Sequence, residues 1–126
     1  MYDYDDQNIF AKILRGEIPS KTVLESEHTF AFEDIQAQAP VHVLVIPKGP
    51  YVNYDHFAHA ASDDEIVDFT RTLRAVCLQT GLAPDDGGDG YRLIANTGDA
   101  GVQEVPHMHV HVLGGRVLGP MLNRED

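Results

Sequence analysis

The sequence predicts an α+β fold: a mostly antiparallel, five-stranded sheet with one long and one short helix. Three observations lead to this prediction. The segments run from a short helix through extended segments to a long amphipathic helix and further extended segments, an order typical of α+β domains. Two of the extended segments are only two residues apart, which favours antiparallel pairing. The length of 126 residues suits one domain, so a single domain over residues 1–126 is expected.

The first elements are expected close to the N-terminus. A short helix fits residues 8–15, where Asn8 can cap the start and Gly16 can end the helix. Its apolar stripe consists of Ile9, Phe10, Ile13 and Leu14. Residues 22–25 and 28–34 then form the antiparallel pair of strands.

A central strand is expected over residues 41–46, a run of β-branched and aliphatic residues between two prolines. His42 lies in this strand, on the same face as two of its aliphatic residues. The long helix begins at the capping box of residues 62–65 and ends at Gly81. Cys77 falls on its apolar face, so we expect a buried small hydrophobic residue there and no nucleophile.

The last two strands, over residues 91–96 and 107–113, follow a turn at residues 85–90. The final strand carries a histidine at every second position: His107, His109 and His111. Alternate residues of a strand share a face, so the three imidazoles point the same way, about 6.6–7 Å apart at Cα.

Composition narrows the classes of function. Nine Lys and Arg stand against 20 Asp and Glu, which gives a net charge of −11. A domain this acidic repels nucleic acid and anionic membranes, so neither is expected as a partner. The single cysteine cannot form an internal disulfide, and the N-terminus lacks the features of a secretory signal. These features predict a cytoplasmic protein.

Three explanations of the histidine row compete. It can be a chance row without a role, a metal site, or a site for phosphate chemistry. Tetrahedral zinc needs ligand nitrogens about 3.4 Å apart, whereas the outer two histidines lie about 13 Å apart at Cα, so no metal is expected. A neutral imidazole is a nucleophile at neutral pH if its other nitrogen keeps a proton, and flanking histidines can then donate to phosphate oxygens. Phosphate chemistry uses all three histidines and is favoured.

The motif at residues 107–113, His-Met-His-Val-His-Val-Leu, resembles the signature of the histidine triad (HIT) family of nucleotide hydrolases and transferases. The likeness extends over nearly the whole chain. It is carried by residues 8–19, 31–35, 38–48 and 91–96, and by a tail at residues 113–122 similar to that of bacterial members of the Hint branch.

The resemblance implies a HIT-like fold and a purine nucleoside phosphoramidate hydrolase that needs no cofactor. It also implies a homodimer whose two sheets join, and we expect the final strand to be open to pairing. By the family pattern, His109 is the nucleophile and His107 orients it through a backbone carbonyl. His111 and His42 complete the phosphate environment.

The resemblance also assigns the residues that bind the purine nucleotide. Asp34 falls where the family binds the ribose hydroxyls, and the base is sandwiched by Ile9, Phe10, Ile13, Phe32 and Ile35. Asn96, Val102, Gln103 and Glu104 fall beside the phosphate and the leaving group.

Two positions depart from the Hint pattern. Val102 stands where a glycine is usual, and Pro106 where an aromatic residue is usual; a proline there resembles the dinucleoside polyphosphate hydrolases of the family. Two alternatives therefore remain open. The protein can be a dinucleoside polyphosphate hydrolase that uses the same two steps, or a nucleotide-binding regulatory module with little turnover.

Overall fold

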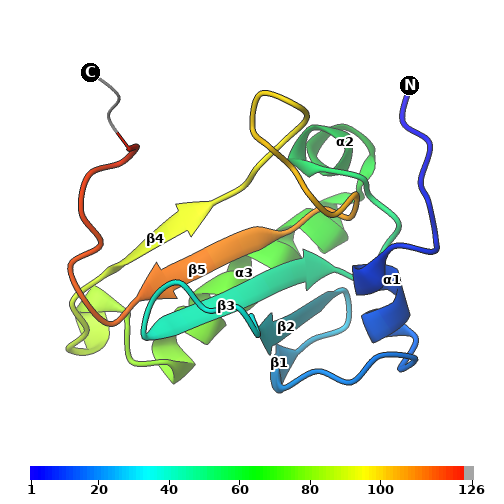
Figure 1. The fold of residues 1–126 in the computed structure, drawn as a ribbon. Helices are drawn as coiled ribbons and strands as arrows, with labels where there is room; N and C mark the ends of the chain where they lie inside the picture. The colour runs from blue at the N-terminus through cyan, green and yellow to red at the C-terminus, as the bar shows by residue number, and fades with distance from the viewer. Residues whose placement is uncertain (124–126) are drawn as a thin grey trace.

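A computed structural model describes residues 1–123 and confirms the predicted α+β class. Five antiparallel strands form one open sheet in the order β1-β2-β3-β5-β4, with the long helix α3 packed on one face (Figure 1). The strands are β1 (Thr22–Glu25), β2 (Thr29–Glu33), β3 (Val41–Pro47), β4 (Tyr91–Ile94) and β5 (Val110–Gly114). The helices are α1 (Ile9–Leu14), α2 (Tyr54–Ala60) and α3 (Asp63–Gln79), with a single 3₁₀ turn, η1 (Pro84–Asp86).

Alternation along the strands divides the apolar residues between the two faces of the sheet. Val43, Val45 and Val112 belong to the larger core beneath α3. Leu44 and Ile46 point to the opposite face, where they pack with residues of α1 and β2. His42 and His111 have the same strand parity as Leu44, so they lie on the face away from α3. One face of the sheet thus packs in the main core, and the histidines lie on the other face.

The final strand differs from the prediction in its start and its position. Strand β5 begins at Val110, so His107 and His109 precede the regular ladder. The register pairs Val45 with Val110, which would bring Met108 opposite Pro47, and a proline has no N–H to donate. Met108 donates instead to the Tyr51 carbonyl, at 2.8 Å. The expectation of a final strand open to pairing is wrong, because β5 lies between β3 and β4.

Helix α2 was not expected from the sequence. It has seven residues, and among them only Phe57 is buried, so it carries no apolar periodicity. The only sequence signal is Asn53, whose side chain accepts a hydrogen bond from the His56 amide at the start of the helix. Helix α3 has the predicted capping box of Ser62 and Glu65.

Cys77 is fully buried in the core beneath α3, as expected for a small hydrophobic residue. Burial also raises the pKa of its thiol, which keeps the sulfur protonated. No helix within residues 1–123 combines the length and the apolar character needed to cross a bilayer.

Candidate active site

His107 is completely buried, and both of its ring nitrogens are hydrogen-bonded. Nε2 lies 2.8 Å from the carbonyl oxygen of Pro47, which can only accept, so Nε2 carries the proton. Nδ1 lies 2.5 Å from the hydroxyl of Tyr4 and therefore accepts from it. Burial lowers the pKa of His107 to about 4, which keeps the ring neutral at pH 7.

His109 has one nitrogen committed and one free. Its Nδ1–H donates to the backbone carbonyl of His107 at 2.7 Å, which leaves the Nε2 lone pair available. The edge of the Phe10 ring packs against the imidazole, with centroids 5.0 Å apart. Burial lowers the pKa of His109, while the charges of Asp34 and Glu104 oppose this shift. The structure therefore presents a neutral imidazole whose unprotonated nitrogen can act as a nucleophile.

His42 and His111 are diagonal neighbours on β3 and β5, and their rings are hydrogen-bonded to each other. The Gln38 amide donates to Nδ1 of His42 at 3.1 Å, so the proton of a neutral His42 must be on Nε2. This Nε2–H donates to Nδ1 of His111 at 2.9 Å. The proton of a neutral His111 is then on Nε2, the one nitrogen left to donate to another molecule.

Burial is the main cause that keeps this pair neutral. It lowers the pKa of His42, and Asp34 opposes the shift. The pKa of His111 is lowered to about 4, by burial first and then by the neighbouring His109 and His42. Because both rings are neutral and hydrogen-bonded to each other, the proton of His111 is held on Nε2. A fixed N–H of this kind can donate to a phosphate oxygen.

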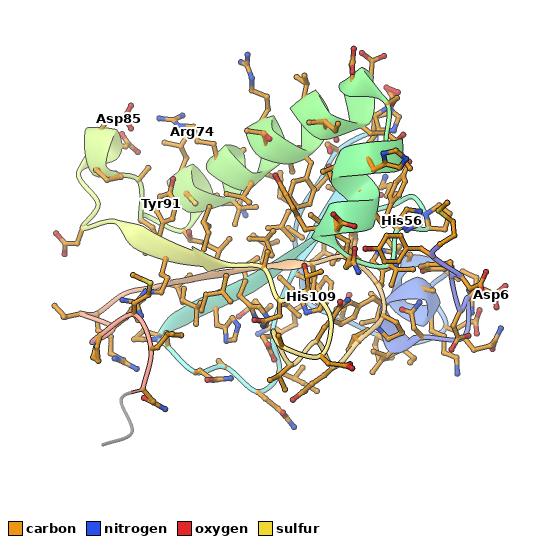
Figure 2. All side chains as sticks on the ribbon, turned by 90° about the horizontal axis from the view of Figure 1, so that it is seen from above. Asp6, His56, Arg74, Asp85, Tyr91 and His109 are labelled. Carbon is orange, nitrogen blue, oxygen red and sulfur yellow. The ribbon has the colours of Figure 1, made fainter. Side chains whose placement is uncertain are left out.

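A pocket of about 410 Å³ opens on this face of the sheet, and His109 lies on the side of the sheet away from α3 (Figure 2). Its volume is in the usual range for small-molecule sites. Most of the site residues predicted from the sequence line it: Ile9, Phe10, Ile13, Phe32, Asp34, Ile35, Asn96, Val102, Glu104, His109 and His111. The structure thus brings together residues from α1, β2, β5 and the loop before β5.

Three of the predicted site residues do not line the pocket. His107 and His42 are buried and reach the pocket only through hydrogen bonds: the His107 carbonyl binds the His109 ring, and the His42 ring binds the His111 ring. Gln103 uses its side-chain amide to hold the loop: Nε2 donates to the carbonyls of Val52 at 2.7 Å and Val105 at 2.9 Å. A direct contact of Gln103 with substrate stays a prediction.

Val102 has a strained backbone. Its φ of 55° is in the left-handed region, and it is the one non-glycine residue with a positive φ in the described part of the chain. This conformation costs a β-branched residue about 1–2 kcal/mol relative to its ordinary backbone. Val102 is also 70 % exposed and lines the pocket, so the site has an exposed apolar side chain on a strained backbone.

Asp34 lies closer to the histidine pair than its expected ribose-binding role suggests. Its Oδ1 accepts from the Gln36 amide at 2.8 Å, and its Oδ2 is 3.4 Å from Nε2 of His42. One ligand atom from each of Asp34, His42 and His111 lies within 4.8 Å of the others. Zinc would need the two nitrogens about 3.4 Å apart, both unprotonated, whereas they share a proton at 2.9 Å. Hydrogen bonding explains this cluster better than a metal does.

Several residues of the pocket were not predicted. They include Ile18, Ser20, Gln38, Leu44 and Val105. Gln38 contributes a backbone amide, for which a sequence gives no side-chain signal. Leu44 was expected to share a face with His42, so its place in the pocket lining follows from strand alternation. Tyr4 does not line the pocket but bonds to His107, and it was also missed. No spacing rule joins two residues that are 103 positions apart.

Comparison with known proteins agrees with this geometry. A family model described as the HIT domain matches residues 15–118. A 13.2 kDa HIT-like protein of Azospirillum brasilense is 51 % identical over 121 residues, which cover 96 % of each chain. The purine nucleoside phosphoramidase of Escherichia coli K12 is 45 % identical over 120 residues, covering 93 % of this chain and 94 % of the relative. A solved HIT family hydrolase from Clostridium thermocellum superimposes with a TM-score of 0.82 at 36 % identity, covering 94 % of this chain and 99 % of that one. The family model and these relatives, together with the row of neutral histidines, show that the chain belongs to the HIT family of hydrolases.

Proposed function

We propose that the protein hydrolyses purine nucleoside phosphoramidates in two steps, through a covalent nucleotidyl group on His109. The observation that carries this proposal is the hydrogen bond from His109 Nδ1 to the carbonyl of His107, which leaves Nε2 as a free lone pair facing the pocket. The relative from Escherichia coli supports the class of substrate, since its name describes a purine nucleoside phosphoramidase.

In the first step, Nε2 of His109 attacks the phosphorus of the nucleoside monophosphoryl group. The P–N bond to the leaving amine breaks while a P–N bond to His109 forms. The amine takes up a proton as it leaves, and the carbonyl of His107 stabilises the positive charge that develops on the His109 ring. The Nε2–H of His111 donates to a phosphoryl oxygen and stabilises the negative charge there.

In the second step, a water molecule attacks the phosphorus of the nucleotidyl group. The bond to Nε2 breaks, and the nucleoside monophosphate leaves with the oxygen and one proton of that water. The other proton passes to solvent, and His109 returns as a neutral imidazole. The apolar part of the pocket, with Phe10 and Phe32 at an interplanar angle of 73°, accepts the base, and the carboxylate of Asp34 can accept hydrogen bonds from ribose hydroxyls.

Glu104 favours an amine leaving group over a polyphosphate. It is exposed, lines the pocket and adds negative charge near His109. A carboxylate there can relay a proton from solvent to a departing amine, and it repels a departing polyphosphate anion. We therefore infer a preference for phosphoramidates, with the dinucleoside polyphosphates as the second candidate class, favoured by the proline at position 106.

The deciding experiment compares an adenosine phosphoramidate with a diadenosine polyphosphate under identical conditions. We expect a higher kcat/KM for the phosphoramidate. In Glu104→Gln, the ratio of the two kcat/KM values should shrink, mostly because poorly activated alkyl amines leave more slowly. A matched control is Glu17→Gln, since Glu17 is an exposed glutamate paired with Arg15 and outside the pocket.

Three results would reject this assignment. A polyphosphate that is the better substrate supports the second candidate, as does a ratio that Glu104→Gln leaves unchanged. Tight nucleotide binding with no turnover of either substrate would instead indicate a regulatory binding module.

We also propose that no metal takes part. Extended treatment with a strong chelator should leave turnover unchanged, and elemental analysis should find far less than one zinc per chain. The physical reason is that both ring nitrogens of His42 are already used in hydrogen bonds, to Gln38 and to His111. One zinc per chain together with chelator-sensitive turnover would favour a metal site at Asp34, His42 and His111.

We further propose a homodimer in which β4 meets its counterpart. Strand β4 is at the edge of the sheet, and α3 packs against β1, β2 and β3, so part of the face of β4 is uncovered. Two apolar side chains, Tyr91 and Leu93, are 39 % and 46 % exposed there. A second copy would cover both the strand edge and these side chains.

Sedimentation tests the dimer. Twice the chain mass of 13.9 kDa is about 28 kDa, and a species of that mass is expected at micromolar concentration. Leu93→Glu should weaken the association by placing a charge in the interface, whereas Val67→Glu, on an exposed position of α3, should not. A monomeric wild-type protein would contradict the proposal.

A further inference from the structure

We propose that Tyr4 is a positioning residue of the histidine triad: its hydroxyl fixes the ring of His107 and, through that residue, the carbonyl that orients His109. The catalytic part of this inference rests on the proposed function; the structural part does not. Tyr4 touches neither substrate nor the attacking nitrogen, so it acts only through His107.

The hydrogen bond from Tyr4 meets a need of His107 that no other group within residues 1–123 fulfils. His107 is fully buried, and Pro47 occupies Nε2, so Nδ1 is an acceptor that requires a donor. The Tyr4 hydroxyl lies 2.5 Å from Nδ1, and the two rings meet edge to face with centroids 5.6 Å apart. Burial raises the pKa of Tyr4, so the phenol keeps the proton that it donates.

Hydrogen bonds connect Tyr4 to His107 and His107 to the nucleophile His109. His107 is held at both ring nitrogens, and its backbone amide donates to the Val105 carbonyl at 2.9 Å. Side chain and main chain of this residue are therefore fixed together. Its carbonyl is the acceptor that keeps the His109 proton on Nδ1. Without the Tyr4 hydroxyl, the buried Nδ1 of His107 has no donor, and any shift of residue 107 that relieves this also moves its carbonyl relative to His109.

The N-terminal segment is built to hold Tyr4 in place. Residues 1–8 run beside α2 to the start of α1 (Figure 1). At the far end, the Tyr2 ring stacks on His56 with centroids 4.9 Å apart, and its hydroxyl donates to Asp55. At the near end, Asn8 Nδ2 donates to the Asp5 carbonyl at 2.7 Å. The Tyr2 ring and Asn8 thus hold the segment on either side of Tyr4, whose ring meets that of His107 edge to face.

The two tyrosines of this segment provide a matched pair of variants. Tyr4→Phe removes only the hydroxyl that meets His107, and Tyr2→Phe removes only the hydroxyl that meets Asp55. Both variants keep their ring, and both lose one hydrogen bond of the same segment. The hydrogen bond of Tyr2 is exposed and that of Tyr4 is part-buried, so Tyr4→Phe is expected to lose more stability. Both variants are therefore compared well below their unfolding temperatures, where a loss of stability alone leaves the histidine tautomers unchanged and a positioning role changes them in Tyr4→Phe.

The first measurement is ¹⁵N NMR of the histidine rings, which needs no turnover. In the wild type and in Tyr2→Phe, the His107 proton should be on Nε2 and the His109 proton on Nδ1. In Tyr4→Phe, the Nδ1 signal of His107 should move and the His109 tautomers should become mixed. The titration midpoint of His107 should also rise, because a donor that favours the neutral ring is gone. Unchanged His107 and His109 signals in Tyr4→Phe would overturn the inference.

The second measurement is steady-state hydrolysis of an adenosine phosphoramidate. Tyr4→Phe should lower kcat by about 10- to 100-fold, the size of loss that a misplacement of the nucleophile by up to about 1 Å causes, with KM within about 2-fold. Tyr2→Phe should stay within about 2-fold of the wild type. A wild-type kcat in Tyr4→Phe, or an equal loss in both variants, contradicts positioning by Tyr4. A wild-type protein that hydrolyses no phosphoramidate contradicts the proposed function, and the NMR result then decides the role of Tyr4.

Discussion

His109→Ala is expected to abolish turnover while the fold is retained. Removal of a nucleophile closes the covalent path, so the loss should exceed the ~10²–10⁴-fold typical of a lost acid or base. The fold should persist because the one hydrogen bond found for the His109 ring is to the neighbouring His107 carbonyl, and its other main contacts are with the Phe10 and His111 rings. Rates of phosphoramidate hydrolysis and a thermal unfolding curve measure both effects.

Mass spectrometry after rapid quenching gives a direct control on the same variant. The wild type should carry an added nucleotidyl mass on the segment that contains His109, and His109→Ala should not. Added imidazole can enter the space left by the missing ring and should restore part of the rate. Near-normal turnover in His109→Ala, or a nucleotidyl group on another residue, would show that the nucleophile is assigned wrongly.

The sequence predicted the part of the site that depends on strand alternation and on the family pattern. Period-two spacing put the histidine row on one face, and the same rule put His42 and Leu44 on that face from β3. These predictions hold even though β5 begins only at Val110: the His109 and His111 ring centroids lie 5.2 Å apart, and the Phe10 ring meets both His107 and His109. The structure therefore confirms the common face while it shortens the strand.

What the sequence could not give is the direction of the hydrogen bonds. The tautomers of His42 and His111 follow from the backbone amide of Gln38, and that of His107 from the carbonyl of Pro47. Backbone groups are present at every residue, so no residue type signals which of them meets an imidazole. The contact of Tyr4 with His107 likewise depends on the path of the N-terminal segment past α2. That helix, with one buried residue, left no periodic pattern to find.

His111→Ala is expected to lower kcat by about 10²–10³-fold, the second large effect after that of His109→Ala. The reason lies in the hydrogen bonds of His42 and His111. Nε2–H of His111 is the donor that the pair leaves free, and it lines the pocket beside His109. Such a donor stabilises the charge that develops on the phosphoryl oxygens, which is present whatever the leaving group. The fall in kcat should therefore be similar for alkyl amines and for well-activated leaving groups, unlike the effect of Glu104→Gln.

His42→Ala provides the graded comparison for this prediction. It leaves His111 in place but removes the donor to its Nδ1, so the His111 proton can move to either nitrogen. A smaller loss of kcat than in His111→Ala is then expected, because a fraction of the rings still presents Nε2–H to the phosphate. His59→Ala, an exposed histidine at the end of α2, should match the wild type. If His111→Ala slows only poorly activated amines, then His111 supplies the proton to the leaving group, and charge stabilisation at the phosphoryl oxygens is not its role.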